Sequence, residues 1–341
     1  MKIFLYSAVL CIAIYACSTI KSPNTIGIDY EYIPIYSNIE FTRDGKNLLF
    51  GDTTGRVIIW DLASNSAVNQ LEGDHSNIHA ITISPDGELI AAGKYDHKIT
   101  IWQLSTGKRL RELIGQFYPV SSLQFSPDGK SLVSGGWDNW TILWNLETEK
   151  PKWIHRRKIQ GSVNAVAFSE SGTFIASGSS DGSIYIHDIK TGKVVLSLNG
   201  HIGKITNILF YRDTHIVSTS YDATVRLWEL TSGSQLMSIG NHKLLIDGLA
   251  ISHDGQYIAT GSMDKSVRIW KRNNLELLAE IVGFDSGVKT VRFSPNSYFL
   301  VAATEECLWY PLNILSLLGS DKYKVKYRAK DLQKKCPTST H

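Results

Sequence analysis

Three residues of this 341-residue chain have the side chains of a hydrolytic triad. Ser218 could supply a nucleophile, His201 a general base, and Asp222 the carboxylate that orients the imidazole. If these three side chains met at an open surface, the chemistry expected would be acyl transfer.

The same residue types return once more along the chain. Thr260, His242 and Asp264 repeat the set, and in both copies the hydroxyl residue stands ten positions, and the aspartate six, before a tryptophan, Trp228 or Trp270. A catalytic site is normally unique, whereas a structural unit recurs. We therefore expect two buried networks in which indole N–H, hydroxyl, imidazole and carboxylate satisfy one another.

The tryptophans belong to a pattern that spans most of the chain. An apolar residue followed by Trp or His recurs at intervals of 39 to 43 residues, at Trp60, Trp102, Trp144, His187, Trp228, Trp270 and Trp309. That period is typical of a four-stranded blade. Turn sequences such as Ser84-Pro85-Asp86-Gly87 separate short apolar strands. The sequence predicts an all-β fold, a seven-bladed β-propeller of antiparallel blades over residues 26–318.

The repeated residues resemble those of the WD-repeat family. An aspartate lies six positions before the Trp position in five copies: Asp96, Asp138, Asp181, Asp222 and Asp264. The resemblance implies a hydrogen-bond chain from Trp through Ser or Thr and His to Asp. Only the Trp228 and Trp270 copies hold the full set. Ala92 replaces the hydroxyl residue beside His75, the third and fourth copies lack the histidine, and Thr54 stands where the first would have Asp.

One residue just before each turn aspartate differs from copy to copy. In the resembled family this loop rims the narrow face, and the position holds Thr53, Tyr95, Trp137, Ser180, Tyr221 and Met263. The second residue of each innermost strand is expected on the same face: Ser37, His79, Ser121, Asn164, Thr206, Asp247 and Lys289. Large side chains in exposed turns indicate either a partner or packing between loops. We select a partner-binding site made of Tyr95, Trp137, Tyr221, Met263, His79, Asp247 and Lys289.

The N-terminus has the features of an export signal. Residues 1–16 hold one basic residue and an apolar run too short to span a bilayer, and Cys17 follows them. The segment Ile14-Tyr15-Ala16-Cys17 resembles a bacterial lipoprotein signal, which implies acylation of Cys17, a tether over residues 17–25 and a membrane-anchored protein of the cell envelope facing the periplasm or the exterior. Ordinary cleavage, which would leave a soluble periplasmic protein, is the alternative.

The charge distribution bears on the partner. Residues 320–341 carry seven Lys or Arg and two Asp, whereas the formal net charge of the whole chain is only +3. The propeller body is therefore weakly acidic, which disfavours a nucleic-acid-binding surface. We expect residues 319–341 to form a basic, solvated tail.

Several details remain open. Cys307 and Cys336 could pair or stay reduced, and either Ile26–Ile33 or Ile314–Leu318 could supply the fourth strand of the seventh blade. We find no motif for catalysis, a metal or a cofactor. We expect a non-enzymatic, monomeric scaffold that binds a protein or peptide on its narrow face. An envelope enzyme or small-ligand binder using the central channel is the rival hypothesis.

Overall fold

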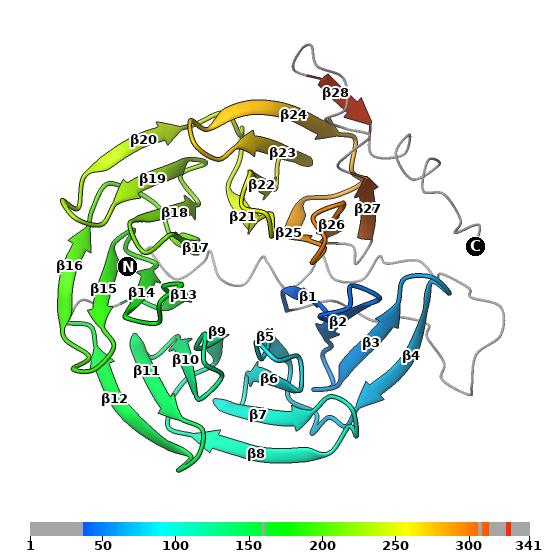
Figure 1. Ribbon diagram of the computed structural model, residues 1–341, viewed down its shortest axis with the longest axis vertical. Coiled ribbons are helices and arrows are strands. Elements are labelled where there is room, and N and C mark those ends of the chain that lie inside the picture. Colours follow the sequence, from blue (N-terminus) through cyan, green and yellow to red (C-terminus); the bar gives the residue numbers. More distant parts are fainter. Residues whose placement is uncertain (1–36, 159–160, 306–308, 314–324, 329–341) are drawn as a thin grey trace, which may run out of the picture.

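The protein forms a ring of seven β-sheets around a central opening (Figure 1). The computed structural model describes residues 37–158, 161–305, 309–313 and 325–328. In six sheets the first four strands, and in the seventh the three described strands, are antiparallel and follow chain order from the centre outward. The seven-bladed β-propeller predicted from the repeat period is confirmed.

The strands fall into four concentric sets. The innermost strands are β1 (Ile39–Phe41), β5 (Ile78–Ile83), β9 (Val120–Phe125), β13 (Val163–Phe168), β17 (Ile205–Tyr211), β21 (Ile246–Ile251) and β25 (Val288–Phe293). The second strands are β2 (Asn47–Gly51), β6 (Leu89–Lys94), β10 (Ser131–Gly136), β14 (Phe174–Ser179), β18 (His215–Ser220), β22 (Tyr257–Ser262) and β26 (Phe299–Thr304). The third strands are β3 (Val57–Asp61), β7 (Lys98–Gln103), β11 (Trp140–Asn145), β15 (Ile184–Asp188), β19 (Val225–Glu229), β23 (Ser266–Lys271) and β27 (Trp309–Asn313). The outermost strands of blades 1 to 6 are β4 (Ser66–Leu71), β8 (Arg109–Ile114), β12 (Lys150–Arg156), β16 (Val194–Leu198), β20 (Gln235–Ile239) and β24 (Glu276–Val282).

The hairpin turns form where their residue types predict them. In the turn from β5 to β6, the Gly87 N–H donates to the Ser84 carbonyl at 2.8 Å, and Gly87 has a φ of 81°. A positive φ costs glycine less than other residues, which is why most of these turn sequences end on it.

The hydrophobic core lies between blades. The second strands are almost fully buried, because both of their faces pack on neighbouring sheets, whereas an outermost strand such as β12 is largely exposed. One cluster joins Leu49 and Ile59 of blade 1 to Ile81, Ile90 and Trp102 of blade 2. Each blade thus completes the core of the next.

The ring closes by packing of the seventh blade on the first. Val301 and Ala303 of β26 share a cluster with Ile39 and Phe50, and Arg292 pairs with Glu40 at 3.2 Å. The described part of blade 7 consists of β25, β26 and β27. Both segments considered for its fourth strand lie outside the described residues, so the choice between them stays open.

The C-terminal segment differs from the solvated tail predicted for it. Val325–Arg328 forms β28, which pairs in parallel with the outer edge of β24 and gives blade 6 a fifth strand (Figure 1). An outermost strand leaves backbone hydrogen-bonding groups unpaired, and β28 satisfies those of β24. The rest of the predicted tail lies outside the described residues.

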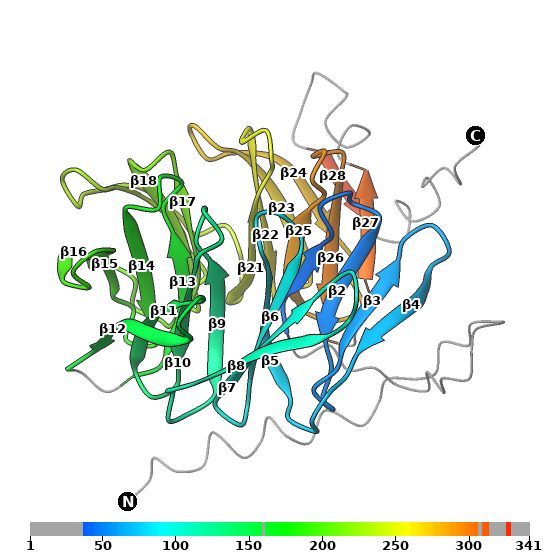
Figure 2. The ribbon, with the colours of Figure 1, turned by 60° about the horizontal axis from the view of Figure 1, so that its bottom comes forward.

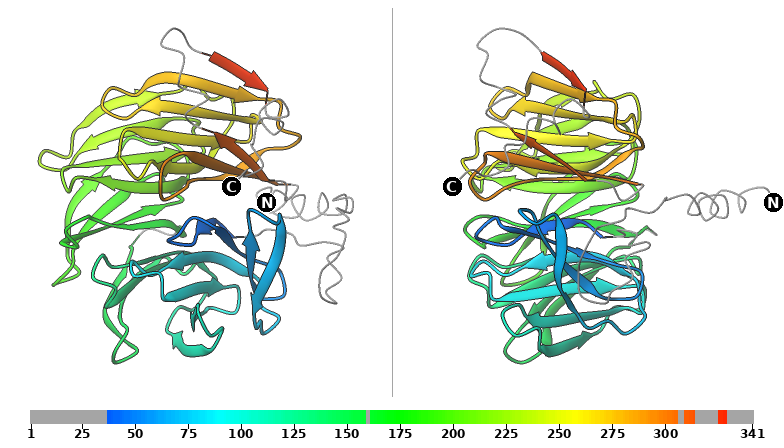
Figure 3. Two further views of the ribbon diagram at one scale, coloured as in Figure 1. Left: turned by 45° about the vertical axis from the view of Figure 1, so that its right-hand side comes forward. Right: turned by 90° about the vertical axis from the view of Figure 1, so that its right-hand side faces the viewer.

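The strands run between the two faces of the ring, and loops project on either side (Figures 2 and 3). One face carries the turns from first to second and from third to fourth strands. The other carries the loops from second to third strands and the crossings to the next blade; we call it the narrow face. Within the described residues no helix is long and apolar enough to cross a membrane.

Candidate functional site

The first triad-like set forms the network expected of it. Trp228 Nε1 donates to Ser218 Oγ at 2.8 Å, and Ser218 Oγ lies 2.8 Å from His201 Nε2. His201 Nδ1 lies 2.8 Å from the carboxylate of Asp222. When Nδ1 donates to Asp222, Nε2 accepts the Ser218 proton, so every member of the chain is satisfied.

The second set is built the same way. Trp270 Nε1 donates to Thr260 Oγ1 at 2.9 Å, His242 Nε2 lies 2.8 Å from that oxygen, and His242 Nδ1 lies 3.0 Å from Asp264. Both networks are as predicted, although the structure adds Arg268, which pairs with Asp264 at 3.2 Å.

Burial assigns both networks to the scaffold. Ser218 and Thr260 have no exposed surface, so neither hydroxyl can reach a substrate. Burial lowers the pKa of His201 and of His242, which keeps both imidazoles neutral near pH 7. Burial alone would raise the pKa of Asp222, but the hydrogen bonds from His201 and Thr224 outweigh it and hold that pKa well below its usual value.

Two blades without the histidine use other side chains, which the sequence did not indicate. In blade 3, Gln116 donates its amide to Asp138 at 3.3 Å. In blade 4, the buried Arg157 guanidinium lies 3.6 Å from Asp181 and 3.9 Å from the ring centroid of Tyr185. Arg157 directly follows β12, which is a largely exposed strand, yet its own side chain is buried.

Blade 2 departs further from the pattern. His75 is exposed and Asp96 does not contact it in the described network. Instead the buried side chain of Lys94 pairs with Asp74. This ion pair is another element that the family resemblance did not indicate.

The predicted rim positions are structurally equivalent. In six blades the backbone N–H of this residue donates to the carbonyl of the residue just before the innermost strand, at 2.9 to 3.1 Å. The donors are Tyr95, Trp137, Ser180, Tyr221, Met263 and Glu305. Glu305 of blade 7 completes the series, and the sequence comparison had not included it.

The second predicted set owes its position to a repeated β-bulge. In blades 2 to 7 the pairing of the first two strands skips one residue, which is His79, Ser121, Asn164, Thr206, Asp247 or Lys289. A bulge leaves its extra residue unpaired and turns its side chain out of the sheet. Ser121 and Thr206 use that freedom to donate to Val163 and Ile246 of the next blade. His79, Asp247 and Lys289 remain at the channel mouth.

Three of the predicted site residues meet in one group. The ring centroids of His79 and Tyr95 are 5.7 Å apart, those of His79 and Trp137 are 5.6 Å apart, and those of Tyr95 and Trp137 are 6.2 Å apart. Tyr95 is 53% and Trp137 47% exposed. We call His79, Tyr95 and Trp137 the aromatic cluster; it spans blades 2 and 3.

A second group lies on blades 5 to 7, across the central opening from blade 2 (Figure 1). Lys289 Nζ lies 3.2 Å from Asp247 and 3.6 Å from Glu305, and Lys204 Nζ lies 5.2 Å from the ring centroid of Tyr221. Burial raises the pKa of Tyr221, and the negative charge of Asp247 adds to that rise. We call these five residues the charged cluster.

Met263 is placed differently from the other site residues. It is half-buried, and its Sδ packs so closely on Gly287 of blade 7 that a β-carbon there would clash. Its side chain therefore contacts a neighbouring loop of the rim, which was the alternative to partner binding.

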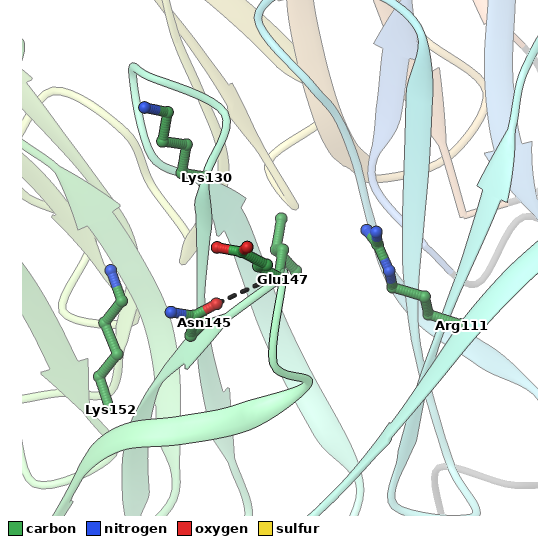
Figure 4. Close-up of a pocket in the computed structure, with 6 residues that line it drawn as sticks. Arg111, Lys130, Asn145, Glu147 and Lys152 are labelled. Carbon is green, nitrogen blue, oxygen red and sulfur yellow. Dashed lines mark hydrogen bonds between the residues drawn. The ribbon is translucent and has the colours of Figure 1, made fainter.

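A groove lies on the opposite face, between blades 2 and 3 (Figure 4). It has a volume of about 410 Å³ and is lined by Arg111, Lys130, Asn145, Leu146, Glu147 and Lys152. Arg111 already pairs with Glu149 at 3.4 Å, and Lys152 donates to Ser131 at 2.8 Å. The labelled side chains do not converge on one point (Figure 4). The groove is a weaker candidate than the narrow face.

Other predictions concern residues that the structure does not describe or groups that it does not contain. Residues 1–16, Cys17, the tether over 17–25, Cys307 and Cys336 all lie outside the described residues. Among the part of the chain that is described, no three His, Cys, Asp or Glu side chains are grouped as metal ligands.

The profile of the family described as WDR41, a β-propeller, matches residues 147–328, which is more than half of the chain. The WD domain, G-beta repeat, matches residues 65–103 and 107–145.

Curated relatives match shorter stretches. Autophagy-related protein 16 of Arabidopsis thaliana is 27% identical over 141 residues, 40% of this chain and 27% of that protein. Nuclear distribution protein nudF of Aspergillus niger is 28% identical over 151 residues, 42% of this chain and 34% of that protein. WD repeat-containing protein 18 of Danio rerio is 28% identical over 175 residues, 48% of this chain and 40% of that protein.

The matches cover only 27 to 40% of the length of these relatives, which are eukaryotic. They support membership of the WD-repeat family but give no support to the prediction of a bacterial lipoprotein. With the repeat period, the seven blades and the two complete Trp networks, the family match leads to one conclusion: the chain belongs to the WDR41 β-propeller family of WD-repeat proteins.

Proposed function

We propose that this protein is a non-enzymatic scaffold that docks a protein or peptide partner on its narrow face. The observation that carries the proposal is the aromatic cluster. The side chains of Tyr95 and Trp137 are about half exposed, although they lie in tight turns whose backbone geometry does not require an aromatic residue. Tyr and Trp are enriched at the centres of protein interfaces, where they bury a large rigid surface at a low cost in side-chain entropy.

The surrounding side chains support the same assignment. A polar rim of Asp247, Lys289 and Glu305 lies beside Tyr221, which is 42% exposed. An apolar anchor next to polar, solvent-accessible groups is the usual composition of a specific interface. Membership of a WD-repeat family favours binding over catalysis, because repeated blades form a rigid platform.

The test is partner capture with a matched pair of variants. Tyr95→Ala, Trp137→Ala and Tyr221→Ala are combined, and the control is Tyr298→Ala, which removes a 51% exposed tyrosine from the turn between β25 and β26 on the opposite face. Partners captured by the unmodified protein should be lost from the triple variant and kept by the control. Retention of every partner by a folded triple variant would place the site elsewhere.

We also propose that the protein is exported and anchored by lipid at Cys17. Support comes from the apolar segment before Ala16 and the Ile14-Tyr15-Ala16-Cys17 sequence. Two or three acyl chains, at about 0.8 kcal/mol per buried methylene, would hold such a protein on a membrane. The intact mass of the mature N-terminus decides, since an acylated Cys17 carries the added mass of fatty acids and a plainly cleaved or uncleaved chain does not.

A further inference from the structure

The two lysines of the charged cluster differ in whether carboxylates lie close enough to balance their charge. Lys289 has two carboxylates within reach, Asp247 at 3.2 Å and Glu305 at 3.6 Å, and their negative charges raise its pKa against the effect of burial. A partner gains little from this lysine, because its charge is already balanced.

Lys204 is in the opposite situation. Its nearest described interaction is with the ring of Tyr221, and within the described residues no carboxylate lies within the 4.0 Å of an ion pair. The side chain is only partly exposed, and burial lowers its pKa, with Lys289 adding to the effect and Asp247 opposing it. A partly desolvated ammonium without a counterion is less stable than one paired with a carboxylate.

Lys204 and the aromatic cluster face the same opening. His79 lies at the start of β5 and Lys204 directly precedes β17, so both stand at the narrow-face ends of innermost strands that surround the central opening (Figure 1). After burial, the positive charge of Lys204 is the second cause that lowers the pKa of His79. His79 in turn contacts both Tyr95 and Trp137. One short segment of a partner can therefore touch the rings and the ammonium together.

The sign of the charges narrows the class of partner. A cationic side chain on the aromatic rings would approach Lys204 and be repelled by it. A polyphosphate backbone would meet Asp247 and Glu305, which lie in the same cluster. A single carboxylate next to an aromatic or large apolar side chain fits both halves of the site.

We propose that the narrow face binds an acidic peptide segment that places an aromatic or large apolar side chain on the aromatic cluster and a carboxylate on Lys204. This inference rests on the proposed function, since it names the chemistry of the partner at that same face. A charge-assisted hydrogen bond in a partly buried setting gives both affinity and orientation.

The test uses a phage-displayed library of random peptides about twelve residues long, selected on the full chain. Enriched peptides are synthesised with a fluorescent label, each with a neutral twin, a control peptide in which Asp is replaced by Asn or Glu by Gln. We expect enriched sequences to carry an aromatic residue and an acidic one, and the acidic form to bind about tenfold more tightly than its twin, a difference of about 1.4 kcal/mol.

Variants then separate the two halves of the site. Lys204→Gln should abolish the preference for the acidic form, Lys204→Arg should restore most of it, and Trp137→Ala should weaken both forms alike. Lys190→Met, which removes an exposed lysine from the turn between β15 and β16 on the opposite face, should change nothing. Melting curves of all variants report whether each is folded.

Three results would overturn the inference: enrichment of basic or uncharged peptides, an acidic preference that survives Lys204→Gln, or no enriched peptide that depends on Lys204. The proposed function fails in a different way, when captured partners or enriched peptides bind the Tyr95, Trp137 and Tyr221 triple variant as well as the unmodified protein.

Discussion

Ser218 and Ala92 occupy equivalent positions in blades 5 and 2. We expect Ser218→Ala and Ala92→Ser to change the free energy of unfolding in opposite directions. In blade 5, Ser218 Oγ joins Trp228 Nε1 and His201 Nε2, each at 2.8 Å, and Trp228 is 1% exposed. Ser218→Ala leaves a buried indole N–H and a buried imidazole nitrogen without a partner. Removing one member of a buried hydrogen-bond network costs about 1 to 3 kcal/mol, and because two groups lose their partner here we expect a loss in the upper part of that range, about 2 to 3 kcal/mol of unfolding free energy.

Blade 2 already has alanine at the position equivalent to Ser218. Ala92 is fully buried, and among the described residues Trp102 Nε1 and Thr100 Oγ1 have no hydrogen-bond partner. Thr100 lies directly opposite Ala92 in the strand register. The hydroxyl introduced by Ala92→Ser can therefore accept from Trp102 and donate to Thr100, and we expect a gain of about 1 kcal/mol.

Both effects are measurable by urea denaturation and by the melting temperature. With an unfolding entropy of about 2.1 cal/mol/K per residue, 1 kcal/mol shifts the melting temperature of a propeller this size by roughly 2 °C. Ser218→Ala should lower it by about 4 to 6 °C and Ala92→Ser should raise it by about 2 °C. A Ser218→Ala variant within 1 °C of the unmodified protein, or an Ala92→Ser variant that loses stability while keeping its fold, would refute the hydrogen-bond reasoning.

The remaining predictions concern acid stability and two features of the blades. Burial lowers the pKa of His187 to about 3, so this histidine stays neutral in the folded protein but takes up a proton below about pH 6.5 in the unfolded chain. The free energy of unfolding is therefore unaffected by His187 above about pH 6.5. Below that pH it falls by up to about 1.4 kcal/mol per pH unit. His187→Trp should make denaturation midpoints between pH 6.5 and 4 less dependent on pH, and an unchanged slope would contradict the assignment. Arg157→Ala leaves Asp181 without its buried partner and removes the stack on Tyr185, so the free energy of unfolding should fall by about 3 kcal/mol in a denaturant titration. Arg157→Lys, which keeps the charge but not the planar group, should have an intermediate stability. Equal stability of the Ala and Lys variants would count against the stack. Truncation after residue 320 removes β28 and exposes the edge of β24, so limited proteolysis should cut blade 6 first and light scattering should rise; cleavage spread evenly over all blades would exclude that role.

Residue types at fixed offsets were sufficient to predict the two complete networks. Trp228, Ser218 and Asp222 repeat as Trp270, Thr260 and Asp264, and such repetition reflects a local requirement that each blade meets within itself. Gln116 and Arg157 could not be predicted, because they fill the same space with other side chains from other positions of the crossing between blades. Gln116 is the second and Arg157 the first residue of its crossing, whereas His201 and His242 are the third. Only contacts with Asp138 and Asp181 reveal their role.

The candidate site was predictable as a set of positions and not as an arrangement. Aligning the repeats places Tyr95 and Trp137 in equivalent loops, which says nothing of whether their rings touch. The bulge that turns His79 and Lys289 toward the channel mouth depends on strand pairing, and no residue type marks it. Lys204 was overlooked because it precedes its strand and belongs to neither repeated position.

The amino-acid sequence by itself determined the blade count, the antiparallel strand order and the identity of the buried network residues, because these follow from a period and from hydrogen bonds made inside one repeat. The tertiary structure decided what happens between repeats: the meeting of three rings from two blades, the pairing of Lys289 with two carboxylates, and the position of the Lys204 ammonium over Tyr221, where no ion-pair partner lies among the described residues. Such contacts depend on the curvature that closes the ring, which is a property of all seven blades packed together.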